Sequence, residues 1–142
     1  MMNDDCTLLN AIRQTTEMGT DGIDAVLPYT SGEFRQALKQ QRTEYQKIHD
    51  SADTLLHKLG GEPEDVSTFT KWSSELTSGL KNMMDSSKST IANMMIQGNT
   101  MGVTKSMQTM RRCDVQDAAV SRLADKLLAT ERTNITQMKS FL

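Results

Sequence analysis

Side chains that commonly act as nucleophiles or metal ligands are scarce in this chain of 142 residues. His49 and His57 are eight residues apart, which on a helix separates them by about 12 Å along the axis, too far to bind one ion together. Cys6 and Cys113 fit neither a zinc-ligand spacing nor a disulfide framework, and nothing predicts that either thiol meets a histidine base. We therefore expect no enzyme activity and no cofactor, with Cys6 near a frayed terminus and Cys113 at a helix junction as reduced, unreactive thiols.

The overall charge is close to neutral, with 16 Lys and Arg residues against 18 Asp and Glu residues and a formal net charge of -2. This balance lacks the strong basic field that binding to a phosphate backbone needs, so we expect no nucleic-acid partner. Asp4 and Asp5 stand where a secretory signal would need basic and then apolar residues. Because no stretch approaches about 18 uninterrupted apolar residues, we also expect no membrane span and a cytoplasmic location.

The elements that must position these side chains are helices, because apolar residues recur at steps of three and four along most of the chain. This period predicts long helices over residues 7–27, 31–59, 88–112 and 114–142. The most regular seam, in 31–59, consists of Phe34, Leu38, Gln41, Tyr45, Ile48, Ala52, Leu55 and Leu59. The corresponding face of 88–112 consists of Ala92, Ile96, Asn99, Val103, Ser106 and Met110. No segment alternates as a strand would, so the predicted fold class is all-α, with residues 1–142 forming a single domain.

Capping and turn residues mark where these helices begin and end. Ser31 and Asp114 are the predicted N-caps of the second and fourth helices, and Gly60 with Gly61 ends the second. Between residues 62 and 87 the helical pattern weakens, and we expect a long crossover that carries a short extra helix. Such a crossover lets the third helix run parallel to the second, which distinguishes ferritin-like bundles from simple up-and-down ones.

Three segments of the chain resemble a known family. They are residues 59–65 (LGGEPED), 96–103 (IQGNTMGV) and 131–142 (ERTNITQMKSFL). They resemble a family of uncharacterised bacterial ferritin-like proteins that is distantly related to rubrerythrin, and the likeness extends over nearly the whole chain. The resemblance implies a ferritin-like four-helix bundle, and the broader superfamily is known for a di-iron centre in the bundle core.

The residues that such a di-iron centre requires are missing from the sequence. The centre takes a glutamate from each of two helices and a Glu-x-x-His motif from each of the other two. None of the seven glutamates is followed three residues later by histidine, and the closest remnants are Gln46 with His49 and Glu131 with Asn134. Residues 86–113 contain no Asp or Glu, so one helix supplies no carboxylate. We therefore expect a degenerate site that holds no metal.

Polar residues at similar heights on the four predicted helices form a candidate polar layer, which consists of Glu17, Gln41, Glu44, Tyr45, Asn99, Glu131 and Asn134. Inside a bundle these groups would have to hydrogen-bond one another or water, whereas Glu17 and Glu44 could instead face solvent at the seam edges. The alternative function is an atypical metal-binding or redox protein, whose ligands would come from Glu17, Glu44, His49 and Glu131.

Methionine is frequent, with 11 in the chain, and seven of them are Met83, Met84, Met94, Met95, Met101, Met107 and Met110. Flexible thioethers suit irregular packing, whereas an exposed cluster would suit a partner or a soft metal such as Cu(I). Since methionines lie all around the predicted helix 88–112, we expect core packing on one side and a subunit interface on the other. The sequence thus predicts a non-catalytic ferritin-like bundle that acts as a structural or protein-interaction module, self-associating through this helix and binding an unidentified protein.

Overall fold

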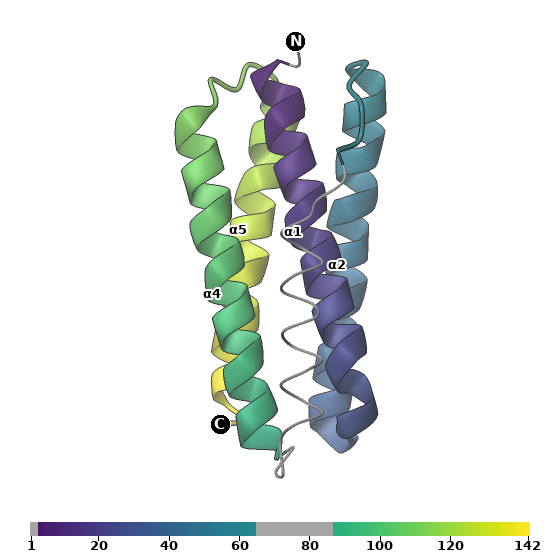
Figure 1. The fold of residues 1–142 in the computed structure, drawn as a ribbon, viewed down its shortest axis with the longest axis vertical. Coiled ribbons are helices and arrows are strands. Elements are labelled where there is room, and N and C mark those ends of the chain that lie inside the picture. Colours follow the sequence, from purple (N-terminus) through teal and green to yellow (C-terminus); the bar gives the residue numbers. More distant parts are fainter. Residues whose placement is uncertain (1–2, 65–86) are drawn as a thin grey trace.

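Helices alone make up the regular structure in the part of the chain that the computed structural model describes, residues 3–64 and 87–142. The long helices there are α1 (Asp4–Val26), α2 (Gly32–Lys58), α4 (Lys88–Arg112) and α5 (Ala118–Lys139), and the single-turn 3-10 helix η1 (Leu27–Tyr29) joins α1 to α2 (Figure 1). The predicted all-α class is confirmed. None of the described helices is both long and apolar enough to cross a membrane. The predicted extra helix falls on residues 65–86, outside the described part.

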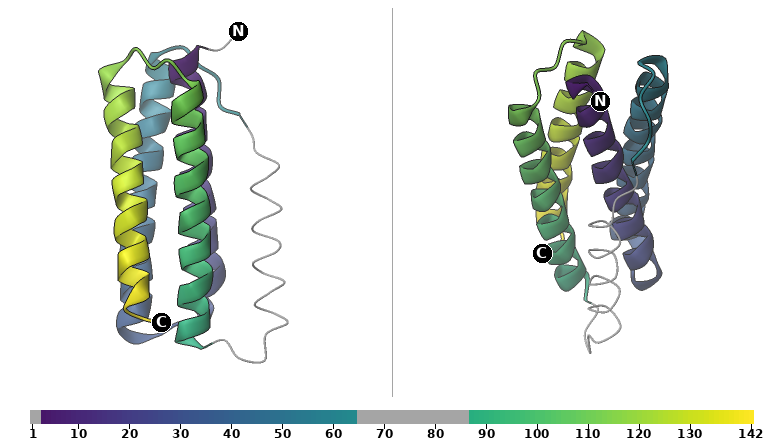
Figure 2. Two further views of the ribbon diagram at one scale, coloured as in Figure 1. Left: turned by 90° about the vertical axis from the view of Figure 1, so that its left-hand side faces the viewer. Right: turned by 45° about the horizontal axis from the view of Figure 1, so that its top comes forward.

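The four long helices pack side by side as a bundle (Figures 1 and 2). α1 packs against α2 and α4, and α5 closes the bundle by packing against the same two helices. α1 and α5 run in one direction, while α2 and α4 run in the other. Each helix is therefore antiparallel to both of its neighbours, and α2 and α4 run parallel across the diagonal, as the predicted long crossover requires.

Local hydrogen bonds and backbone geometry explain where three of the helices begin or end. α1 begins three residues earlier than predicted because the Asn3 side chain accepts a hydrogen bond from the Cys6 amide at 2.9 Å. Gly60, with φ of 73°, ends α2 as predicted, since glycine adopts this left-handed conformation without strain. Ser87 caps α4 by accepting a hydrogen bond from the Thr90 amide at 3.2 Å.

The N-cap of α5 is Asp117, so the prediction that Asp114 caps this helix is wrong. Asp117 Oδ1 accepts a hydrogen bond from the Ala119 amide at 2.8 Å. The Asp114 amide instead donates to Asp4 Oδ2 at 2.7 Å, which ties the α4–α5 connection to the first turn of α1. The same region buries Cys6, which is 2% exposed, so the expectation of a frayed end at this residue is also wrong.

The apolar core extends along the whole bundle, and its fully buried members include Leu9, Ile12, Ile23, Leu38, Ile48, Ile91 and Leu127. Near the end where α5 finishes, the rings of Phe34 and Phe141 stack at an angle with centroids 4.9 Å apart.

Two predicted seams differ from the buried faces by one residue at some of their positions. α2 buries Leu56 in place of Leu55. α4 buries Met95, Gly102 and Thr109 in place of Ile96, Val103 and Met110. In α2 only the last position moves, as expected because a straight helix with 3.6 residues per turn drifts from a 3.5-residue pattern by about 20° per heptad. In α4 the predicted Ala92, Asn99 and Ser106 stay buried and the positions between them each move back by one, so its buried face is turned slightly from the predicted one.

Candidate functional site

A cluster of polar side chains occupies the middle of the bundle, where a ferritin-like protein would hold its metals. The Tyr45 hydroxyl, which is fully buried, donates a hydrogen bond to Asn99 Oδ1 at 2.7 Å. Glu131 and Asn134 from α5 also interact with this hydroxyl, and both are buried. Burial and the nearby Glu131 carboxyl raise the pKa of Tyr45 well above its ordinary value. The cluster thus joins α2, α4 and α5 through one neutral phenol.

Glu131 is the acidic member of this cluster, and only 2% of its surface is exposed. Burial raises the pKa of its carboxyl to about 8, and the hydrogen bond with Tyr45 opposes this rise in part. Removing a carboxylate from water disfavours its charged form, so the group keeps its proton at neutral pH. A protonated carboxyl both donates and accepts hydrogen bonds, which suits a site surrounded by a phenol and two amides.

Two glycines make room for these large side chains. A Cβ atom at Gly19 on α1 would lie 2.7 Å from the Tyr45 ring, closer than carbon atoms approach in proteins. A Cβ atom at Gly102 on α4 would lie 3.3 Å from Glu131 Oε2. The absence of side chains at both positions lets Tyr45 and Glu131 pack flat against the neighbouring helices.

A cavity of about 10 Å³ lies beside the cluster, bordered by α1, α2, α4 and α5. Its lining residues include Thr15, Tyr45, Asn99 and Glu131. Asn99 Nδ2 and Glu131 Oε2 are buried, and neither has a hydrogen-bond partner among residues 3–64 and 87–142. A cavity of this size holds about one water molecule, and such a molecule would satisfy both atoms.

This donor set does not fit a di-iron centre. Two irons need several ionised carboxylates and two imidazoles around one cavity, whereas the cluster contains one carboxyl, which is protonated at neutral pH. Glu17 and Glu44, the other predicted acidic members, have 39% and 40% of their side chains exposed and lie at the bundle's edges. His49 lies with Glu17 on the outer side of α1 and α2. Of the four alternative metal ligands, the structure brings together Glu17 and His49 and separates them from Glu44 and Glu131.

A second polar cluster forms around that Glu17–His49 pair. His49 Nε2 lies 2.8 Å from Glu17 Oε1, and His49 Nδ1 lies 3.5 Å from Asp53 Oδ2. Asp50 lies on the same side of the ring, and Arg13 of α1 forms an ion pair with Asp53. Sequence reasoning missed Asp50, Asp53 and Arg13. The four-residue spacing of His49 and Asp53 places them on one helix face and was a usable signal, whereas the approach of Arg13 depends on how α1 packs.

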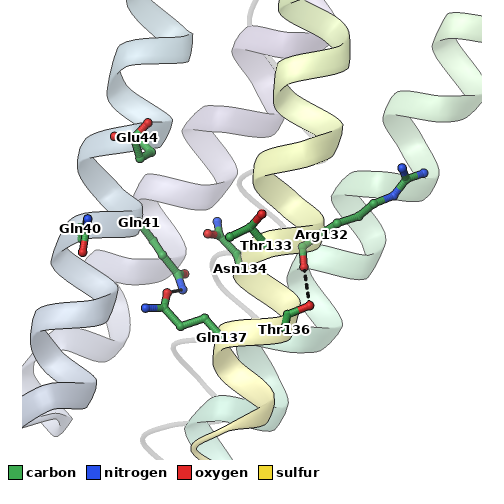
Figure 3. A pocket seen from close by; sticks show the side chains of 8 residues that line it. All are labelled: Gln40, Gln41, Glu44, Arg132, Thr133, Asn134, Thr136 and Gln137. Carbon is green, nitrogen blue, oxygen red and sulfur yellow. Dashed lines mark hydrogen bonds between the residues drawn. The ribbon is translucent and has the colours of Figure 1, made fainter.

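A polar groove of about 540 Å³ runs along the surface between α2 and α5 (Figure 3). It is lined by Gln40, Gln41, Glu44, Arg132, Thr133, Asn134, Thr136 and Gln137. Gln41 Nε2 donates a hydrogen bond to Gln137 Oε1 at 2.7 Å across the groove, while the Arg132 side chain points away from α2 (Figure 3). The groove offers amide hydrogen bonds, and its lining holds no histidine or cysteine that would make a nucleophile and base pair.

The two cysteines lie in the same end of the bundle, and both are free thiols. Burial and the Asp5 carboxylate raise the pKa of Cys6, and burial and the Asp4 carboxylate raise the pKa of Cys113. A raised pKa keeps a thiol protonated and weakly nucleophilic. These surroundings agree with the expectation that neither thiol is reactive.

Comparison with known proteins supports the fold class and goes no further. No family model and no curated protein matches the chain. Among solved structures, the chain is similar to a DUF305 fragment from Deinococcus radiodurans, with a TM-score of 0.75 and 15% sequence identity over 98% of this chain and 95% of that one. At this identity the likeness shows a shared helical fold, and the class of protein established here is an all-α bundle.

Proposed function

We propose that this protein is a non-catalytic ferritin-like bundle with a degenerate di-iron position, and that it serves as a structural or protein-interaction module. The observation that carries the proposal is the chemistry of the bundle centre. There Tyr45, Asn99 and Asn134 surround a single carboxyl group, that of Glu131, whose pKa of about 8 keeps it neutral. The centre therefore works as a hydrogen-bonded core layer that joins the helices.

The metal half of this proposal is tested by loading the protein with iron. The full chain is purified from iron-supplemented cells, and a second sample is reconstituted anaerobically with Fe(II). Iron is then measured per chain after removal of loosely bound metal. We expect no iron in either sample that a Glu131→Gln substitution removes, because the centre lacks ionised ligands. About two irons per chain, lost in a Glu131→Gln variant, would overturn the proposal.

The interaction half rests on the outer surface of α4. Met101 and Met107 are 45% and 38% exposed, and they are two of the four large apolar side chains exposed among the described residues. α4 carries no acidic residue, while Lys105 and Arg111 add positive charge. Methionine is enriched at protein interfaces, and covering these two side chains with another protein surface would remove apolar area from water.

Self-association through α4 is tested by light scattering coupled to size exclusion. We expect the wild-type chain to form dimers or larger oligomers and the double variant Met101→Lys, Met107→Lys to be monomeric, since added charge opposes burial of the interface. Tyr29→Ser is the matched control, because Tyr29 is also exposed (44%) but lies in η1. A wild-type chain that stays monomeric at the highest concentration reached would contradict the role of α4.

A further inference from the structure

The outer seam between α1 and α2 concentrates charged groups that the bundle centre does not use. α1 contributes Arg13 and Glu17, and α2 contributes His49, Asp50 and Asp53. With a neutral imidazole, three carboxylates and one guanidinium leave this cluster with a formal charge of -2. A divalent cation would balance that charge.

Hydrogen bonding selects one tautomer of the imidazole. The Glu17 carboxylate accepts, so His49 Nε2, 2.8 Å from Glu17 Oε1, is the nitrogen that carries the proton. His49 Nδ1 then holds the lone pair. This atom is buried and has no hydrogen-bond partner within the described residues. A histidine that gives one N–H to a carboxylate and keeps its other nitrogen free has the arrangement of metal-binding histidines.

Two carboxylates face that free nitrogen. Asp53 Oδ2 lies 3.5 Å and Asp50 Oδ1 lies 3.8 Å from His49 Nδ1. One ligand atom from each of these three residues can be chosen such that all lie within 4.8 Å of one another. Ligands bound to zinc at about 2.0–2.2 Å in a tetrahedron stand roughly 3.2–3.6 Å apart, so small side-chain rotations would bring all three onto one ion.

Other members of the cluster hold the three candidate ligands in place. The Arg13 guanidinium pairs with Asp53 through Oδ1, which leaves Asp53 Oδ2 turned toward the imidazole. Asp50 Oδ1 accepts a hydrogen bond from the Gln46 amide at 3.0 Å, an exposed contact that a metal would readily replace. Glu17 and Arg13 are therefore positioning residues for His49 and Asp53.

We propose that His49 Nδ1, Asp50 and Asp53 bind one divalent transition-metal ion of the zinc type, with the remaining coordination positions open to water. Zinc is a borderline ion that binds nitrogen and carboxylate oxygen ligands, and this site offers one nitrogen and two such oxygens. The thioethers of the methionines are softer ligands that favour Cu(I). This site lies apart from the bundle centre, so it is independent of the proposed function.

The proposal is tested by titrating the metal-free full chain with zinc chloride in a calorimeter. We expect one zinc per chain for the wild type, at least about ten-fold weaker binding for His49→Gln, and about ten-fold weaker binding for Glu17→Gln. His57→Gln is the matched control, because it removes the other histidine of α2 and leaves the cluster intact. Asp50→Asn is a second ligand variant at an exposed position, where the substitution does not disturb packing.

A spectroscopic readout separates binding at His49 from binding elsewhere. In nitrogen-detected histidine spectra, zinc should move the Nδ1 resonance of His49 and leave both nitrogens of His57 in place. Absence of zinc binding would overturn the proposal. Binding that His49→Gln and Asp50→Asn do not weaken would overturn it as well. The iron measurement on the bundle centre stays distinct, because iron held there would be lost in Glu131→Gln and iron held on the seam would be lost in His49→Gln.

Discussion

Replacing Glu131 by glutamine should remove a large pH dependence of folding stability. In the folded chain, burial raises the pKa of this carboxyl from its ordinary value of 4.5 to about 8. Between these two values the folded state holds a proton that the unfolded state has released, so rising pH favours unfolding. The stabilisation is fully present below about pH 4.5, declines as pH rises, and is gone by about pH 8.

The magnitude follows from the size of the pKa shift. Each pKa unit corresponds to about 1.4 kcal/mol, so the whole interval corresponds to about 5 kcal/mol at most. Glutamine keeps the shape and hydrogen-bonding capacity of a protonated glutamate but does not titrate. The difference in unfolding free energy, Glu131→Gln minus wild type, should therefore grow by about 1.4 kcal/mol for each pH unit between roughly pH 5 and pH 8.

The assay is urea unfolding of both proteins at a series of pH values, with free energies from linear extrapolation. Taking the difference cancels every group that titrates alike in the two chains. Glu44→Gln, at a half-exposed position on α2, is the control and should keep the wild-type profile. A Glu131→Gln difference that stays flat across this interval would refute the reasoning, because it would mean that the carboxyl is solvated or paired with a cation.

Three further substitutions test the packing around this cluster and the start of α5. Gly19→Ala should destabilise the protein despite a helix-propensity gain of about 1 kcal/mol, because its Cβ would clash with the Tyr45 ring; a more stable variant in urea unfolding would contradict this. Tyr45→Phe should cost about 1–3 kcal/mol in the same assay, since it removes the hydrogen bond to Asn99. Asp117→Ala should cost about 1 kcal/mol, whereas Asp114→Ala should change thermal stability by less than about 0.5 kcal/mol; equal losses would argue against Asp117 as the cap.

Much of the fold could be predicted because helix period and turn residues are local signals. Gly60 ends α2 through its own backbone conformation, and the bounds of α4 follow from the repeat within the segment itself. Where a choice depends on another helix, the sequence does not decide it. Asp114 and Asp117 are both suitable caps, and the hydrogen bond from the Asp114 amide to Asp4 determines which one serves.

In the candidate sites, too, features set within one helix could be predicted and features set by contacts between helices could not. Gln41, Tyr45 and Asn99 lie on predicted seams, so their burial could be predicted from spacing alone. The two glutamates differ in position on their helices: Glu131 lies four residues after Leu127 and three before Asn134 on the buried face of α5, whereas Glu17 is half-exposed beside the buried face of α1. Gly102 illustrates the point: it lies on the buried face where Val103 was predicted, and a Cβ atom there would lie 3.3 Å from the Glu131 carboxyl, a tight contact.

Burial determines which acidic residues of this bundle are able to hold a cation. In the centre, desolvation keeps the Glu131 carboxyl protonated, and the Tyr45 phenol and amides around it complete a neutral network. On the α1–α2 seam, the side chains of Asp50 and Asp53 are 68% and 44% exposed, so water reaches their carboxyl groups, while His49 lies mostly shielded beside them. A metal needs ionised ligands and a free nitrogen lone pair, and it competes with protons for both. The α1–α2 seam therefore offers a cation the charged ligands that the centre of the bundle does not.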